Sequence, residues 1–117
     1  MQRDELYLAD IVEAAQAIAT FLAEAQEQEF AGNDLLRSAV LQKLIVIGEA
    51  AGRVSESLRQ RYASVPWIDI IAFRNIAVRA YFSVNWQIVW LTATEEVPAL
   101  RAQVAHILED IGSGDEQ

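Results

Sequence analysis

The sequence contains no cysteine and only one histidine in 117 residues. Without cysteine the chain cannot form disulfides, use a thiol as a nucleophile or hold a metal through sulfur. The absence is compatible with a reducing cytoplasm. Glycine and proline are also scarce, with five and two residues, and no repeat, low-complexity tract or linker is visible. We therefore expect one domain, long enough to bury a hydrophobic core without covalent crosslinks.

Long apolar runs are missing as well, although 53% of the residues are hydrophobic. The longest apolar stretches are residues 44–47 and residues 67–73, the second of which is interrupted by Asp69. A helix that spans a bilayer needs roughly 18–20 residues. Residues 1–5 include no basic region followed by an apolar one, so no signal peptide is predicted. We expect a cytoplasmic protein without a membrane segment. The apolar excess leaves spare apolar surface in so small a domain, which favours an oligomer.

Basic residues are outnumbered, nine against 17 acidic residues, and the formal net charge is −8. Proteins that hold nucleic acid by bulk electrostatics usually carry a basic face, so the composition argues against that class. A local basic site is still compatible with the sequence. Two arginines, Arg74 and Arg79, lie close together in an otherwise apolar segment, and arginine offers a planar fork that suits phosphate and carboxylate groups.

Apolar residues recur at the spacing of three and four that is typical of helices. No segment alternates with a period of two, so no strand is predicted. The fold class is therefore all-α, an antiparallel up-and-down bundle of four to five helices. A single domain covers residues 1–112, and residues 113–117 form a frayed tail. The helices are predicted over residues 4–27, 34–61, 66–83 and from residue 86 onward.

Several residues are predicted to begin, cap or interrupt these helices. Residues 30–34 are expected to form a turn in which Asn33 or Asp34 caps the next helix. Asp4, Ser64 and Asn85 are predicted caps of the other helices. Proline lacks a backbone donor, so Pro98 is expected to kink or interrupt the last helix.

Two glycines, Gly48 and Gly52, lie four residues apart inside the second predicted helix. Each costs about 1 kcal/mol relative to alanine in a helix interior. Small residues with this spacing usually permit the close approach of another helix. Glu49, between them, is the one charged residue of an apolar stretch, and a buried glutamate there could pair with Arg74 or Arg53.

The segment from Phe73 to Phe82 holds the candidate chemistry. Arg74, Val78 and Tyr81 are spaced four and three apart, so they are predicted to share a helix face. Arg79 lies roughly 140° around the helix from Arg74, at ~100° per residue. A second copy of the helix, related by a two-fold axis, could place both arginine pairs in one cleft. The alternative to a catalytic role is a structural role for this arginine pair, because paired arginines often form salt bridges or line an interface.

The chemistry that suits such a cleft is cleavage of RNA without a metal ion. The 2′-hydroxyl is then the nucleophile, and the site needs a group that moves a proton and a cation that stabilises charge at phosphorus. Arginine suits the second task. It is almost always protonated and cannot act as a good general base, whereas histidine could.

The same segment resembles the HEPN signature, which is an arginine, four to six residues and then a histidine. HepT-type proteins extend it with one further residue and a tyrosine. Arg74 matches the arginine, Asn75 the polar residue that follows it and Tyr81 the tyrosine, while Arg79 occupies the histidine position. Other segments are similar to the family as well, so the resemblance covers nearly the whole chain: residues 47–51, 66–67, 70–75, 81–85, 89–90 and 97–100.

The resemblance implies a homodimer with a HEPN-like fold that cuts RNA, with tRNA among the targets. It implies the toxin of a type VII toxin–antitoxin system, whose partner is an MntA-type nucleotidyltransferase antitoxin. That partner adds AMP groups to the motif tyrosine, which corresponds to Tyr81, and phosphates beside Arg74 would block RNA through charge and bulk. The partner uses ATP, and no cofactor or metal is expected in this chain.

Arg79 at the histidine position predicts impaired catalysis and leaves three interpretations open. The chain is an engineered inactive form, a natural inactive member that still binds its antitoxin or RNA, or an active variant with another proton carrier. A rival from another class is a non-catalytic helical dimer that binds a protein or nucleotide partner. Asp34 and Glu49 are weaker candidates for supporting the site from the second helix. The single histidine, His106, is expected at the surface of the last helix.

Overall fold

The computed structural model describes residues 2–115, with side chains described from residue 3 to residue 112. Its elements are all helical, and no strand occurs within the described part of the chain, which confirms the predicted all-α class. The elements are α1 (Gln2–Leu22), α2 (Glu27–Gly32), α3 (Asp34–Arg53), α4 (Glu56–Arg61), α5 (Trp67–Arg79), the 3₁₀ turn η1 (Tyr81–Ser83), α6 (Trp86–Leu91), the π-helical segment η2 (Thr92–Glu96) and α7 (Val97–Asp115).

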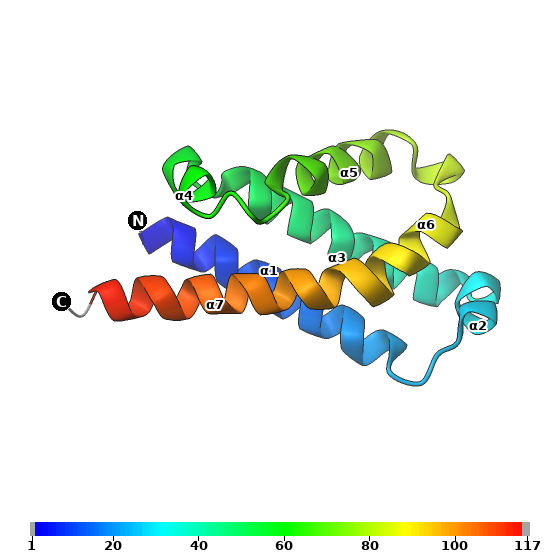
Figure 1. Cartoon of the computed structure of the whole chain (residues 1–117). Coiled ribbons are helices and arrows are strands. Elements are labelled where there is room, and N and C mark those ends of the chain that lie inside the picture. The colour runs from blue at the N-terminus through cyan, green and yellow to red at the C-terminus, as the bar shows by residue number, and fades with distance from the viewer. Residues whose placement is uncertain (1, 116–117) are drawn as a thin grey trace.

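The long helices lie roughly antiparallel to their neighbours in an elongated bundle, with the start of α1 and the end of α7 at the same end of the molecule (Figure 1). Helix α1 packs against α3 and α7, and α5 packs on α3. Fully burying a large aliphatic side chain is worth about 1.5–3 kcal/mol, so the shared core of these helices is the main source of stability. Its least exposed members are Leu8, Ile11, Ile18, Val40, Leu41, Val54, Val89 and Val104.

The segment between α1 and α3 differs from the prediction. Helix α1 ends at Leu22 rather than near residue 27, and residues 30–34 are not simply a turn, because the short helix α2 precedes Asn33. Phe30 explains the extra helix, since its buried ring packs against Trp86 and Trp90, with centroids 6.2 and 5.3 Å away. Asn33 caps α3, as predicted, and its side chain accepts a hydrogen bond from the Leu36 N–H at 3.0 Å.

The second predicted helix is divided into α3 and α4 by an extended residue, Val54. Asp4 accounts for this break. It was predicted as an N-cap of the first helix, but it lies within α1, is 4% exposed, and accepts hydrogen bonds from Ser55 N–H at 2.8 Å and Ser55 Oγ–H at 2.6 Å. The bound N–H cannot continue the α3 ladder, and Ser55 instead caps α4 through its contact with the Leu58 N–H. A contact across 51 residues therefore sets the boundary.

Helix α5 begins at Trp67 with Pro66 at its cap position, so the predicted cap at Ser64 is wrong. The loop before it is held by Tyr62. The Trp67 indole N–H donates to the Tyr62 carbonyl at 3.1 Å, and the Tyr62 hydroxyl donates to Asp110 on α7. This bond to the carboxylate, together with partial burial, raises the pKa of Tyr62 above its usual 10.0.

Pro98 does not interrupt the last helix, contrary to one predicted outcome, because α6, η2 and α7 follow one another without a break. The turn immediately before Pro98 is π-helical and therefore wider than an α-helical turn. It leaves room for the proline ring and tolerates the missing backbone N–H of proline. Thr94 Oγ1 donates to the Trp90 carbonyl within the same region, at 2.8 Å.

Asn85 caps α6 as predicted. Residues 113–115 of the predicted tail continue α7, and residues 116–117 lie outside the described residues. None of the described helices is long and apolar enough to cross a membrane.

Replacing Asp4 by Ala should lower the free energy of unfolding by about 1–3 kcal/mol, because two Ser55 donors would lose their acceptor in a partly buried place. Urea denaturation followed by circular dichroism measures the change. Asp10→Ala, at an exposed position of the same helix, is the matched control and should change stability by less than about 0.5 kcal/mol. Equal losses in both variants would contradict a special role for the Asp4–Ser55 contact.

Candidate active site around Arg74

The segment that forms α5, η1 and α6 differs from the rest of the chain in charge. Residues 70–94 contain two arginines and no aspartate or glutamate, although the chain has 17 acidic residues. This arrangement separates the two arginines in sequence from the carboxylates that dominate elsewhere. A cation attracts phosphate most strongly where no carboxylate competes, so the segment is a candidate place for an anionic ligand.

Gly48 determines how α5 lies on α3. An ideal Cβ at Gly48 would be 2.2 Å from Arg74 Cβ, 2.8 Å from Arg74 Cγ and 3.2 Å from the Ile70 carbonyl oxygen. No real side chain fits there, so the prediction of a close helix approach at this glycine is confirmed. Gly52 differs, because a Cβ there would meet only Ile71 Cγ1, at the ordinary contact distance of 3.9 Å.

The Arg74 side chain rises from this contact and is half-buried. One terminal nitrogen donates to Asn75 Oδ1 at 3.1 Å, while Nε is buried without a hydrogen-bond partner. No carboxylate of the described residues forms an ion pair with it. Buried donors in proteins are usually satisfied, so an arginine with a vacant donor and no counter-ion is suited to an anionic ligand, and phosphate matches its planar fork.

Arg79 is the last residue of α5 and its side chain is exposed. Tyr81 is not on that helix. The chain leaves α5 at Ala80, with φ −118° and ψ 37°, and Tyr81 begins η1. The prediction that Arg74, Val78 and Tyr81 share one helix face is therefore wrong for Tyr81. Its ring is 40% exposed, and its hydroxyl lies 3.5 Å from Ser38 Oγ of α3.

The two weaker candidates on α3 lie at the surface. Asp34 is 92% exposed in its side chain and pairs with Arg37 at 3.3 Å. Glu49 is exposed and forms no ion pair with Arg74 or Arg53, so the expectation of a buried glutamate is wrong. Helical periodicity places Glu49 next to the buried Gly48 on the outer side of α3. His106 is exposed on α7, as expected.

Two residues near the motif were not identified from the sequence. Ser38 contacts the Tyr81 hydroxyl only because α3 and η1 meet in space, and no local pattern indicates that meeting. Phe82 is fully exposed, at 101%. Its position next to the motif tyrosine was visible, but an apolar residue beside a helix end is ordinarily expected to be buried.

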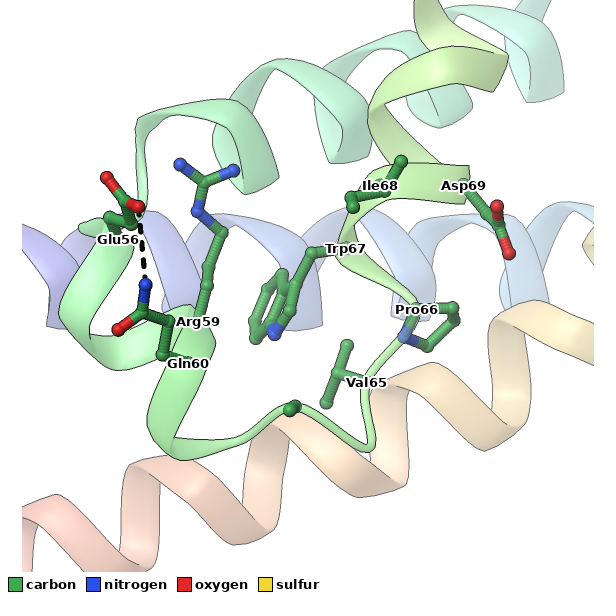
Figure 2. A pocket seen from close by; sticks show the side chains of 9 residues that line it. Glu56, Arg59, Gln60, Val65, Pro66, Trp67, Ile68 and Asp69 are labelled. Carbon is green, nitrogen blue, oxygen red and sulfur yellow. Dashed lines mark hydrogen bonds between the residues drawn. The ribbon is translucent and has the colours of Figure 1, made fainter.

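A separate hollow of about 610 Å³ lies at the other end of α5 (Figure 2). Its walls come from α4, the loop after it and the first turn of α5, and Gln60 donates to Glu56 beside it at 3.3 Å. None of the predicted site residues lines it. No group of three or more His, Asp or Glu side chains that could hold a metal ion occurs among the described residues. The lining residues are Glu56, Arg59, Gln60, Ala63, Val65, Pro66, Trp67, Ile68 and Asp69.

Comparison with known proteins gives consistent matches along most of the chain. Residues 11–107 match the family model described as "Ribonuclease HepT-like". The chain belongs to the HepT-like ribonuclease family. Similar relatives of this family include "Putative RNase MJ1380" of Methanocaldococcus jannaschii, 32% identical over 84% of this chain and 90% of the relative. "Probable ribonuclease HepT" of Thermococcus cleftensis is 30% identical over 83% of this chain and 88% of the relative. No solved structure matches the chain.

Membership of the HepT-like family agrees with the resemblance that the Arg74 segment indicated. It also agrees with the HEPN-like all-α bundle of the structure. It also gives the site a chemical context, because the matched relatives are named as ribonucleases. The features that suit a phosphate-binding site, namely the unpaired guanidinium and the acid-free segment, lie within the matched residues.

Gly48→Ala should destabilise the fold by about 1–3 kcal/mol, the usual cost of overpacking a well-packed contact, and this should exceed the gain in helix propensity. Thermal or urea unfolding measures it.

Gly52→Ala is the matched control on the same helix, because a methyl group fits there. It should leave stability unchanged or raise it by up to about 1 kcal/mol. If both variants gained stability, the close approach of α5 to α3 at Gly48 would be contradicted.

Proposed function

We propose that this chain is the toxin of a toxin–antitoxin pair, a metal-independent ribonuclease of the HepT type whose own catalysis is impaired by Arg79. The observation that carries the proposal is the Arg74 guanidinium, half-buried, without an ion-pair partner among the described residues and set in an acid-free segment of a ribonuclease family member. An RNA phosphate, with tRNA as one candidate source, is the ligand that best matches it.

The proposed working form is a homodimer. Ile68 and Ile76 on α5 are 81% and 65% exposed, although they are large and apolar. At eight residues apart they lie on one face of the helix, and Arg79 follows on about the same face at ~100° per residue. A second copy packed on this face would bury both isoleucines and bring the two copies of Arg79 close together, while Arg74 lies roughly 140° around α5, on the side that meets Gly48 of α3.

In the proposed reaction the 2′-hydroxyl of a nucleotide loses its proton and attacks the adjacent phosphorus, which forms a 2′,3′-cyclic phosphate. The 5′-oxygen of the next nucleotide leaves and takes up a proton. Arg74 stabilises the negative charge that develops on the phosphoryl oxygens, and Asn75 holds its guanidinium through the 3.1 Å bond. The attack also requires a group that accepts the 2′-proton. Arg79 stays protonated and cannot accept it, although its charge still binds phosphate.

Arg79→His should therefore raise cleavage of a tRNA substrate by about 10²- to 10⁴-fold, the usual contribution of a general acid or base. The gained activity should fall as pH decreases through the ordinary histidine pKa of about 6.5, because the protonated ring cannot accept a proton. Gel analysis of a labelled tRNA across a pH series measures both effects.

Arg101→His on α7 is the matched control, since it introduces the same residue at an exposed place outside the motif. It should leave cleavage unchanged. If Arg79→His cleaved no faster than the unaltered chain, the missing histidine would not be what limits activity.

The proposed regulation acts at Tyr81. An MntA-type nucleotidyltransferase antitoxin would bind ATP, and the Tyr81 oxygen would form a bond to the α-phosphorus while pyrophosphate leaves. The hydroxyl is accessible for this step, because Tyr81 is 40% exposed and its contact with Ser38 is long, at 3.5 Å. The added phosphate would bring negative charge to the arginine-bearing segment and exclude RNA. ATP is consumed by the partner, and this chain needs no cofactor.

Incubation of the chain with ATP and an MntA-type nucleotidyltransferase should add AMP units to the chain, as measured by intact-mass analysis. Tyr81→Phe should abolish the gain, whereas Tyr7→Phe on α1 should not. A full gain in Tyr81→Phe would place the modification at another residue and contradict the proposed regulation.

The second candidate is a non-catalytic helical dimer that binds a protein or nucleotide partner. Arg79 favours it, because this residue keeps a cation but removes the proton acceptor. The two candidates separate experimentally: modification at Tyr81 without any cleavage, even in Arg79→His, would support the binding module over the ribonuclease.

A further inference from the structure

Phe82 is the most exposed aromatic side chain in the part of the chain that the structure describes, at 101%, compared with 40% for Tyr81 and 38% for Phe21. Single exposed apolar residues are common on protein surfaces and by themselves indicate nothing. Phe82 differs because its backbone is held in place and because it adjoins the motif.

The turn that carries Phe82 is fixed by several contacts. The Ala80 N–H donates to the Ile76 carbonyl at 2.8 Å, and the Ser83 N–H donates to the Ala80 carbonyl at 2.9 Å. The rings of Tyr81 and Phe82 meet edge to face, with centroids 5.6 Å apart and planes at 80°. A perpendicular contact covers little of the Phe82 ring, and its full exposure leaves the ring available to a flat partner. Figure 1 shows this turn at the end of α5, projecting from the bundle between α5 and α6.

The charge of the sequence segment that carries the turn limits the kind of partner. Phe82 lies within the acid-free residues 70–94, which also contain Arg74 and Arg79, in a chain of net charge −8. A nucleic acid cannot gain most of its affinity here from a broad basic groove, because the chain has only nine basic residues. Stacking of a base on an aromatic ring does not depend on charge and supplements the few available arginines.

We propose that Phe82 is a base-stacking platform that holds an unpaired RNA base beside the phosphate bound by the motif arginines. The proposal rests on the proposed ribonuclease function and adds a substrate class to it, single-stranded or looped RNA. In duplex RNA the bases are stacked on one another, and an exposed ring cannot reach their faces. Phe82 is thus a positioning residue for the nucleotide rather than a group that moves a proton.

Fluorescence anisotropy of a labelled single-stranded oligouridylate, titrated with the full chain, tests the proposal. Phe82→Ala should weaken binding by about five- to 150-fold, the range for loss of one stacked base. Phe82→Trp should restore it, and RNA should quench the tryptophan fluorescence of this variant more than that of the unaltered chain, which already has three tryptophans. Leu6→Ala, which shortens an exposed apolar residue of α1, is the matched control and should bind as the unaltered chain does. All variants should keep the same melting temperature.

The salt dependence separates stacking from charge. For single strands each neutralised phosphate contributes about −0.7 to the slope of log affinity against log salt. Phe82→Ala should lower affinity without changing this slope, whereas Arg79→Ala should make it shallower by about 0.7. A changed slope in Phe82→Ala would contradict stacking as its mode of action.

Other outcomes would overturn the proposal in distinguishable ways. If Phe82→Leu bound RNA as well as Phe82→Trp, the contact would be apolar rather than a base stack. If Phe82→Ala kept full RNA affinity but lost self-association in sedimentation, or lost modification by the nucleotidyltransferase, the ring would belong to a protein interface. If the unaltered chain and Arg79→His both bound no RNA, the proposed function itself would fail, and the stacking platform with it.

Discussion

The contact between α3 and α5 at Gly48 is the constraint on which the candidate site depends. A glycine in the middle of a helix costs about 1 kcal/mol relative to alanine, yet any side chain here would collide with Arg74. The missing side chain lets the base of Arg74 rest on the α3 backbone, which fixes where its guanidinium emerges. Asn75 then holds one end of the guanidinium, and the neighbouring Nε keeps an unfilled donor. Gly48 therefore lowers the stability of α3 but allows the Arg74 guanidinium to occupy this position.

The position of the Arg74 guanidinium matters for anion binding because the rest of the chain is mostly acidic. A net charge of −8 would ordinarily repel RNA. At physiological salt, however, the repulsion between exposed charges is largely screened at separations beyond a Debye length of about 8 Å. The segment of 25 residues, 70–94, contains two arginines and no carboxylate, so a phosphate bound there meets no negative charge from the segment itself. Stacking and a small number of arginines suit such a site, whereas long-range electrostatic attraction does not.

The sequence predicted the parts of this arrangement that depend on local pattern. Helical periodicity, the caps Asn33 and Asn85 and the close approach at Gly48 follow from neighbouring residues, and the motif around Arg74 is contiguous. The errors have a common cause in contacts between distant residues. Asp4 ends α3 by binding Ser55, and the segment around Phe30 forms a helix because two tryptophans of α6 cover the Phe30 ring. The exposure of Glu49 and the departure of Tyr81 from α5 likewise depend on packing, which periodicity alone does not give.

Arg79 shows how binding and proton transfer separate in such a site. At the end of α5 its positive charge is favoured by the helix dipole and suits the proposed binding of an anion. The same permanent charge removes the reversible protonation that a histidine would supply there. A chain with this residue keeps the side chains to which we assign recognition, including Arg74, Asn75 and the exposed rings of Tyr81 and Phe82. Recognition of RNA or of a modifying partner should therefore outlast catalysis, because the two tasks rest on different side chains.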